Sequence, residues 1–115
     1  MDSITLIVTA LSAGARALRR DGAPAELRDA HAGLVTLAGL RLRGRPNGAM
    51  VLRQHAEDST RWGRPLAKAL EAEGAGGDSG LIAAAQAVLL LTDGPGSSRG
   101  KYALDAASGS GQAPG

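Results

Sequence analysis

The chain has 115 residues, a formal net charge of +2 and no cysteine, which suits one small domain and excludes disulfides, thiolate nucleophiles and zinc sites of the cysteine type. The charge is uneven, because residues 1–70 carry eleven Arg and Lys against six Asp and Glu, whereas the remainder carries two against five. A basic N-terminal portion favours an anionic partner, either a membrane or a nucleic acid.

The first predicted helix covers residues 3–20, and its first thirteen residues, 3–15, carry no charge. Asp2 or Ser3 can cap its start, and apolar residues recur at helical spacing. Thirteen residues span about 20 Å as a helix, short of the roughly 30 Å of a bilayer core, and the only charged side chain before Ile4 is acidic, which disfavours a signal peptide. The segment therefore either completes a helical core or enters a bilayer conditionally.

Four further helical segments follow the first. Residues 24–43 begin with Pro24 and end before Gly44, a short third helix can be capped by Asn47, and a fourth can start at Asp58 or Thr60. Pro65 would bend the fourth helix unless it lay in the first turn, and residues 62–65 could instead form a separate turn. The last helix, capped by Asp78 and ending near Asp93, is apolar and is interpreted as the buried central helix.

No segment shows the alternating pattern of a strand, and the connections are short. The sequence predicts an all-α fold, a small up-and-down bundle of four to five helices over residues 1–93, with a flexible tail over residues 94–115. Leu, Ala, Val and Ile must fill the core, because phenylalanine is absent. Within the tail, residues 101–105 either dock weakly or are solvated.

Constellations of catalytic or ligand-binding residues are hard to find. His31 and His55 lie in no two-histidine metal spacing, and the serines and glycines form no nucleophile elbow, Walker sequence or dinucleotide fingerprint. We interpret both histidines as partly buried or surface residues, and we expect no enzyme activity, no cofactor and no metal.

A basic run at residues 41–45 could contact phosphate groups, but it lies in no helix-turn-helix frame and has no interleaved aromatic side chains. Arg41 and Arg43 also complement the macrodipole at a helix C-terminus. Nucleic-acid binding is therefore not expected.

Four segments of the chain resemble the bacterial Bell domains, which are common in actinobacterial genomes: MDSITLIVTALSAGA at residues 1–15, GRP at 44–46, WGRPL at 62–66 and GKYALD at 100–105. Bell domains are small helical bundles likened to the fungal HeLo and HeLo-like domains and to the four-helix bundle of the necroptosis pseudokinase, all regarded as membrane-targeting cell-death executioners. The resemblance covers roughly residues 1–105.

The resemblance implies that the N-terminal helix is the membrane-active element. The positions carried over to this chain are Asp2, Ile4, Leu6, Ile7, Val8 and Leu11. Once released, their apolar side chains would enter the bilayer, while three arginines behind them would contact anionic headgroups at about 1 kcal/mol each: Arg16, Arg19 and Arg20. Because one such helix is too short to span comfortably, bilayer thinning or oligomerisation would have to help.

The tail departs from the family pattern. Family members often continue into a short amyloid signalling motif, through which a receptor templates their assembly. Here Gly111 and Gln112 are followed by no apolar, β-prone run. Either the motif has decayed or the signal arrives differently.

The resemblance, together with the uncharged first helix, therefore implies a membrane-permeabilising or pore-forming cell-death effector in a bacterial immune or programmed-death response. Its partners would be anionic lipids, other copies of the chain when active and an upstream receptor, and it would move from the cytoplasm to the inner face of the cell membrane. The alternative is a soluble helical adaptor without membrane activity, which would have its first helix fully embedded and an exposed apolar groove elsewhere.

Overall fold

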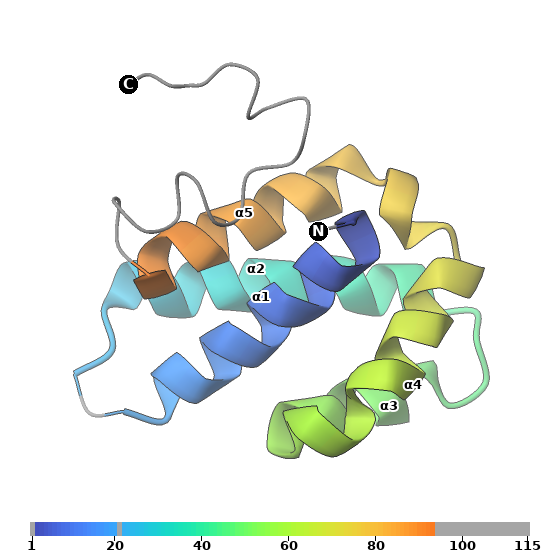
Figure 1. Ribbon diagram of the computed structural model, residues 1–115, viewed down its shortest axis with the longest axis horizontal. Helices are drawn as coiled ribbons and strands as arrows, with labels where there is room; N and C mark the ends of the chain where they lie inside the picture. Colours follow the sequence, from blue (N-terminus) through green and yellow to red (C-terminus); the bar gives the residue numbers. More distant parts are fainter. Residues whose placement is uncertain (1, 21, 94–115) are drawn as a thin grey trace.

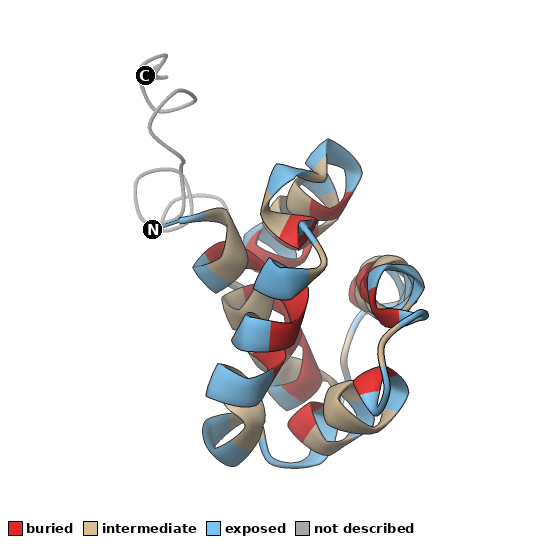
Figure 2. Ribbon diagram, turned by 90° about the vertical axis from the view of Figure 1, so that its right-hand side faces the viewer, coloured by how far each residue is buried: buried red, intermediate tan, exposed pale blue. Residues whose placement is uncertain are grey.

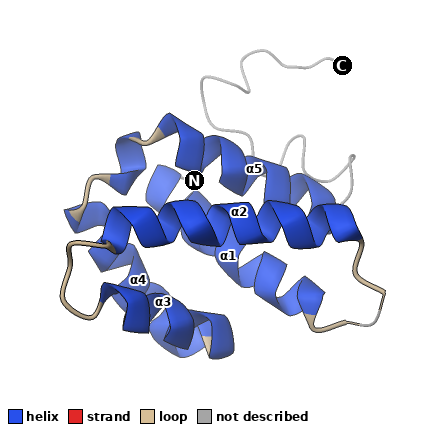
Figure 3. Ribbon diagram, turned by 180° about the vertical axis from the view of Figure 1, so that it is seen from behind, coloured by secondary structure: helices blue, strands red, loops and turns tan. Residues whose placement is uncertain are grey.

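The computed structural model describes residues 2–20 and 22–93, and the predicted tail lies outside these residues. Within them the chain forms five α-helices and one short 3-10 helix, with no strand (Figures 1 and 3). The elements in chain order are α1 (Ser3–Leu18), α2 (Ala25–Leu42), α3 (Gly48–Glu57), α4 (Ser59–Ala72), η1 (Ala75–Gly77) and α5 (Ser79–Asp93). The predicted all-α bundle is confirmed.

Three of the helices, α1, α2 and α5, form the main body of the molecule. As Figure 1 shows, α1 and α5 run in the same general direction, and α2 runs against both. The end of α2 is joined to the start of α5 by an ion pair, in which Arg41 Nε lies 2.9 Å from Asp78 Oδ2. The helices α3 and α4 form a hairpin that packs against one side of α1 and α2.

The core lies around α1, which packs against all four other α-helices. In Figure 2 the buried residues follow the sides of the helices that face one another, and the exposed residues follow the outer sides. The last helix is less central than its composition indicated, because α5 packs mainly on α1 and α2 and leaves Leu90 and Leu91 49% and 39% exposed. The central helix is therefore α1, and this part of the sequence interpretation is corrected.

Three aspartates cap the helices as the sequence indicated. The carboxylates of Asp2, Asp58 and Asp78 accept hydrogen bonds from backbone N–H groups three residues later, at 2.7, 3.2 and 3.1 Å. Asn47 precedes α3 in a different way, because its side chain makes no capping hydrogen bond and its backbone adopts a left-handed conformation with φ of 65°. Asparagine tolerates that conformation better than most residues.

The structure contradicts the separate turn considered for residues 62–65. Pro65 lies inside α4, which continues without a break from Ser59 to Ala72. Proline removes one helical hydrogen bond and crowds the carbonyl four residues earlier, but the helix is stabilised on either side of it by the Asp58 cap and by the burial of Leu66 and Leu70. Packing therefore overrides the local cost of the proline.

Candidate functional site

The residues expected to enter a membrane lie inside the folded bundle. Leu6 and Ile7 are 0% exposed and Leu11 is 2% exposed, whereas Ile4 and Val8 are partly buried against the same core. Asp2 is exposed and serves as the cap of α1. The structure therefore brings the five apolar positions together as core residues.

Burial of these side chains accounts for a large part of the stability of the fold. Each fully buried side chain among Leu6, Ile7 and Leu11 contributes about 1.5–3 kcal/mol, so the three contribute roughly 5–9 kcal/mol together. A domain of this size has a total free energy of unfolding of about 5–15 kcal/mol. Release of α1 into water would therefore unfold the bundle, unless another apolar phase received the helix.

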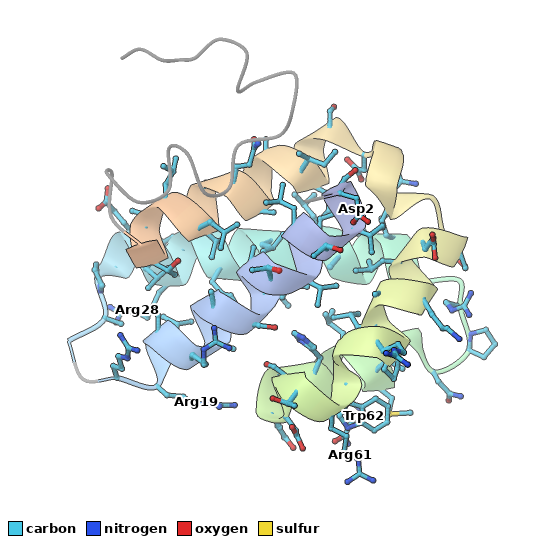
Figure 4. All side chains as sticks on the ribbon, in the orientation of Figure 1. Asp2, Arg19, Arg28, Arg61 and Trp62 are labelled. Atoms are coloured by element: carbon cyan, nitrogen blue, oxygen red, sulfur yellow. The ribbon has the colours of Figure 1, made fainter. Side chains whose placement is uncertain are left out.

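The three arginines behind this segment differ in their surroundings. All three are exposed, but the guanidinium of Arg19 donates hydrogen bonds to the carbonyl oxygens of Ala56 and Glu57, the latter at 3.3 Å. Those carbonyls belong to the last turn of α3, where a cation also complements the helix dipole. Arg16 and Arg20 make no side-chain hydrogen bond within the described residues. Figure 4 labels Arg19, which lies beyond the end of α1.

A polar cluster that the sequence did not reveal lies between α1 and its neighbours. His55 is 1% exposed and is the one buried polar or charged side chain within residues 2–20 and 22–93. Its Nε2 lies 3.1 Å from Ser12 Oγ on α1. The Ser12 hydroxyl also donates to the Val8 carbonyl oxygen at 3.0 Å. This cluster therefore connects α3 to the central helix.

The second histidine packs against α1 two residues further along. A Cβ atom at Gly14 would lie 2.4 Å from His31 Cδ2, which no real side chain tolerates without movement. Gly14 is therefore the residue that allows α2 to place an imidazole ring directly on the backbone of α1. The sequence signal for this cluster is a serine and a glycine in the uncharged segment of α1, together with the two histidines of the chain.

Both histidines favour the neutral state. Burial lowers the pKa of His55, and the positive charge that His31 can carry lowers it further. Burial also lowers the pKa of His31, although a hydrogen bond to the Leu11 carbonyl partly offsets that effect. The carboxylates behave differently: the Thr5 N–H lowers the pKa of Asp2.

The arrangement of Ser12 and His55 does not suit a nucleophile and its base. A serine hydroxyl has a single proton. While Ser12 donates that proton to the Val8 carbonyl oxygen, His55 must donate its Nε2–H to Ser12 Oγ and cannot accept a proton from it. Across the described part of the chain, no group of three or more His, Cys, Asp or Glu residues could hold a metal ion. We therefore interpret the Ser12–His55 contact as a structural link between α1 and α3.

Two further findings bear on the class of protein. Among the helices that the structure describes, none combines the length and the apolar character needed to cross a membrane. Comparison with protein-family models, curated proteins and solved structures finds no match to this chain.

Proposed function

We propose that the chain is a membrane-permeabilising effector held in a latent state, in which α1 is the helix that enters the bilayer. The observation that carries the proposal is the position of α1: the uncharged segment at residues 3–15 is the most enclosed part of the bundle. A folded chain with this helix buried would have low affinity for lipid. Activity would require a trigger that opens the bundle.

Lipid would replace the contacts that α1 loses when it leaves the core. The bilayer interior receives the same apolar side chains that the core buries, so the transfer of Leu6, Ile7 and Leu11 from one to the other changes their free energy far less than exposure to water. Sixteen residues of helix measure about 24 Å, less than the roughly 30 Å of hydrocarbon. Several copies that thin the bilayer together would accommodate this mismatch.

The arginines at the end of α1 would orient the inserted helix. Arg16, Arg19 and Arg20 follow the apolar segment directly, and each would gain about 1 kcal/mol at an anionic leaflet. Arg19 would first have to leave the carbonyl groups of Ala56 and Glu57. The proposal therefore includes anionic lipids and further copies of the chain as partners, at the inner face of the cell membrane.

A substitution pair tests the role of α1 without removing its core. Thr9 lies in the middle of α1 and is partly exposed. Thr9→Asp places a charge in the inserting helix, and the free-energy cost of such a charge at the bilayer centre is about 2.5–3.5 kcal/mol. Thr36→Asp makes the same change on the exposed surface of α2 and serves as the matched control. We expect Thr9→Asp to abolish dye release from phosphatidylglycerol vesicles and toxicity in cells, and Thr36→Asp to preserve both.

Circular dichroism must show that both variants fold. If Thr9→Asp does not, Thr5→Asp takes its place, because Thr5 is exposed in the first turn of α1, where a carboxylate is favourable. Undiminished leakage by a folded α1 variant would contradict the proposal, as would a wild-type chain that leaves anionic vesicles intact under every condition that opens the bundle.

One observation favours the second candidate, a helical adaptor. The first helix is embedded, which is half of the pattern expected of an adaptor, and three large apolar side chains are exposed: Leu40, Leu90 and Leu91. Leu40 lies near the end of α2 and the other two near the end of α5, so they lie at opposite ends of two antiparallel helices. An adaptor would lose its cellular effect on changing Leu90 and Leu91 to serine and would cause no vesicle leakage.

A further inference from the structure

The α3–α4 hairpin is joined to the rest of the molecule at one end and attached by polar contacts at the other. Its two connections, residues 43–47 and 73–78, lie at the same end of the bundle, on the right in Figure 1. The ion pairs of Arg41 with Asp78 and of Arg45 with Glu73, at 2.9 and 3.2 Å, lie at this end. Gly74 there has a φ of 74°, a conformation that glycine adopts readily. This end can act as a hinge.

The free tip of the hairpin is attached to α1 by few contacts of a different kind. His55 is hydrogen-bonded to Ser12 at 3.1 Å, and the carbonyl oxygens of the next two residues, at the end of α3, accept hydrogen bonds from the Arg19 guanidinium. The tip has none of the carboxylate to guanidinium pairs that join the hinge end, within the residues described. At the tip these polar contacts, from one buried imidazole and one exposed arginine, add to the apolar packing of Leu52, Leu66 and Leu70 on the core.

The buried imidazole is favourable only while it is neutral. With Nε2–H donated to Ser12, the Nδ1 atom of His55 carries the lone pair and has no hydrogen-bonding partner in the described structure. A proton added at Nδ1 would create a charged N–H group in a site that is 1% exposed to water, and a buried charge without a partner is strongly destabilising.

No neighbouring carboxylate compensates that charge. The helices that pack against α3 are α1, α2 and α4, and the charged or titratable residues that they and α3 carry close to His55 in the sequence or near its partner Ser12 include Arg16, Arg19, His31, Glu57, Asp58 and Arg61. Among these groups only His31 shifts the pKa of His55, and it does so downward. The Asp58 carboxylate is already bound to the Arg61 N–H as the cap of α4. Protonation of both rings would therefore add repulsion to desolvation.

We propose that His55 is an acid-sensitive latch, which keeps the α3–α4 hairpin closed on α1 and α2 while its ring is neutral and releases the tip of the hairpin when the ring is protonated, with His31 on the neighbouring helix adding repulsion when it is protonated too. As the trigger that frees α1 for a membrane, the latch rests on the proposed function. The opening itself involves no lipid and is measured in solution.

The direction of the pH dependence follows from the burial of the two rings. Both have a lower pKa in the closed bundle than the ordinary value of about 6.5. The closed state is therefore fully favoured above about pH 6.5 and loses that advantage as the pH falls toward the depressed values. For each pKa unit of depression, the ratio of open to closed molecules rises by up to about tenfold per histidine.

Fluorescence resonance energy transfer can measure the opening, because the chain has a single tryptophan and no cysteine. Trp62 lies on the hairpin, near the start of α4 (Figure 4). An acceptor dye on Ala87→Cys, at an exposed position of α5, reports the distance between the hairpin and the main body. We expect energy transfer to fall between about pH 7.5 and about pH 5, while far-ultraviolet circular dichroism retains the helical signal.

Two variants assign the change to the histidines. His55→Gln keeps a side chain that can donate to Ser12 but cannot be protonated, and His31→Gln does the same for the other ring. We expect His55→Gln to remove most of the acid-induced fall and His31→Gln to shift it to lower pH, because His31 no longer repels the charge. If His55→Gln does not fold, imidazole NMR titration of the unsubstituted chain tests the same point, since both pKa values must lie below 6.5.

Three results would overturn the latch: constant energy transfer down to about pH 5, an unchanged transition in folded His55→Gln, or loss of the helical signal together with energy transfer. Vesicle leakage at the same pH values separates the two proposals. Opening without leakage leaves the latch and refutes the membrane function, whereas leakage with no opening refutes the latch and leaves the membrane function.

Discussion

The substitution Gly14→Ala adds a single methyl group to α1 and would show how closely α1 packs against α2. A Cβ atom there would lie 2.4 Å from Cδ2, 3.1 Å from Cγ and 3.2 Å from Nε2 of His31. The ring cannot keep its place, so Gly14→Ala forces His31 or the two helices apart. Overpacking of this kind costs about 1–3 kcal/mol.

The gain in helix propensity opposes this cost and must be subtracted. Replacing glycine by alanine within a helix stabilises it by roughly 0.5–1 kcal/mol, so the net destabilisation from Gly14→Ala is about 0–2.5 kcal/mol. Gly33 provides the matched control, because it lies within α2 and a Cβ there would meet nothing within 4 Å. Gly33→Ala should therefore stabilise the bundle by the propensity term alone.

Urea denaturation followed by circular dichroism gives both free energies of unfolding. We expect the Gly14→Ala midpoint to lie below that of the unsubstituted chain and the Gly33→Ala midpoint above it. In a His31→Ala background the obstructing ring is absent, and Gly14→Ala should then become stabilising by up to about 1 kcal/mol. The packing argument fails if Gly14→Ala is as stable as Gly33→Ala, or if the His31→Ala background leaves its effect unchanged.

Two other predictions concern α4 and the tip of the hairpin. Pro65→Ala restores a donor to the Arg61 carbonyl inside α4 and should stabilise the bundle by about 1–3 kcal/mol, and a lower melting temperature would contradict this. Arg19→Ala removes the hydrogen bonds to Ala56 and Glu57 at an exposed site and should cost about 1 kcal/mol or less. Hydrogen exchange should quicken in the last turn of α3, and equal quickening in Arg20→Ala would remove the special role of Arg19.

The local features of the fold could be predicted from the sequence because they depend on residues close together in the chain. Asp2, Asp58 and Asp78 cap helices through N–H groups only three residues away. The predicted ends of the first two helices, at residues 3–20 and 24–43, lie within two residues of the observed ends of α1 and α2. Helix caps and helix ends depend on residues only a few positions apart, so the local sequence is enough to predict them.

Features that depend on several helices at once could not be predicted in this way. Pro65 argues against a continuous helix locally, and only the burial of neighbouring side chains explains why α4 continues. The contact of Ser12 with His55 joins residues 43 positions apart, and no spacing rule connects them. For the same reason the apolar composition of α5 indicated burial without showing that one end of the helix would remain exposed.

The packing of α1 against α5 determines when the chain can fold during its own synthesis. Residues 3–18 leave the ribosome before residues 79–93, which form the helix against which they pack most extensively. Contacts between distant parts of a chain delay folding, because the intervening segment must be ordered before they form. The helix α1 therefore emerges without its main partner and, among the α-helices, can pack only on α2, α3 and α4 until residues 79–93 have been synthesised. A ribosome stalled before residue 79 would hold a chain that cannot complete its core, with the uncharged segment of α1 still accessible.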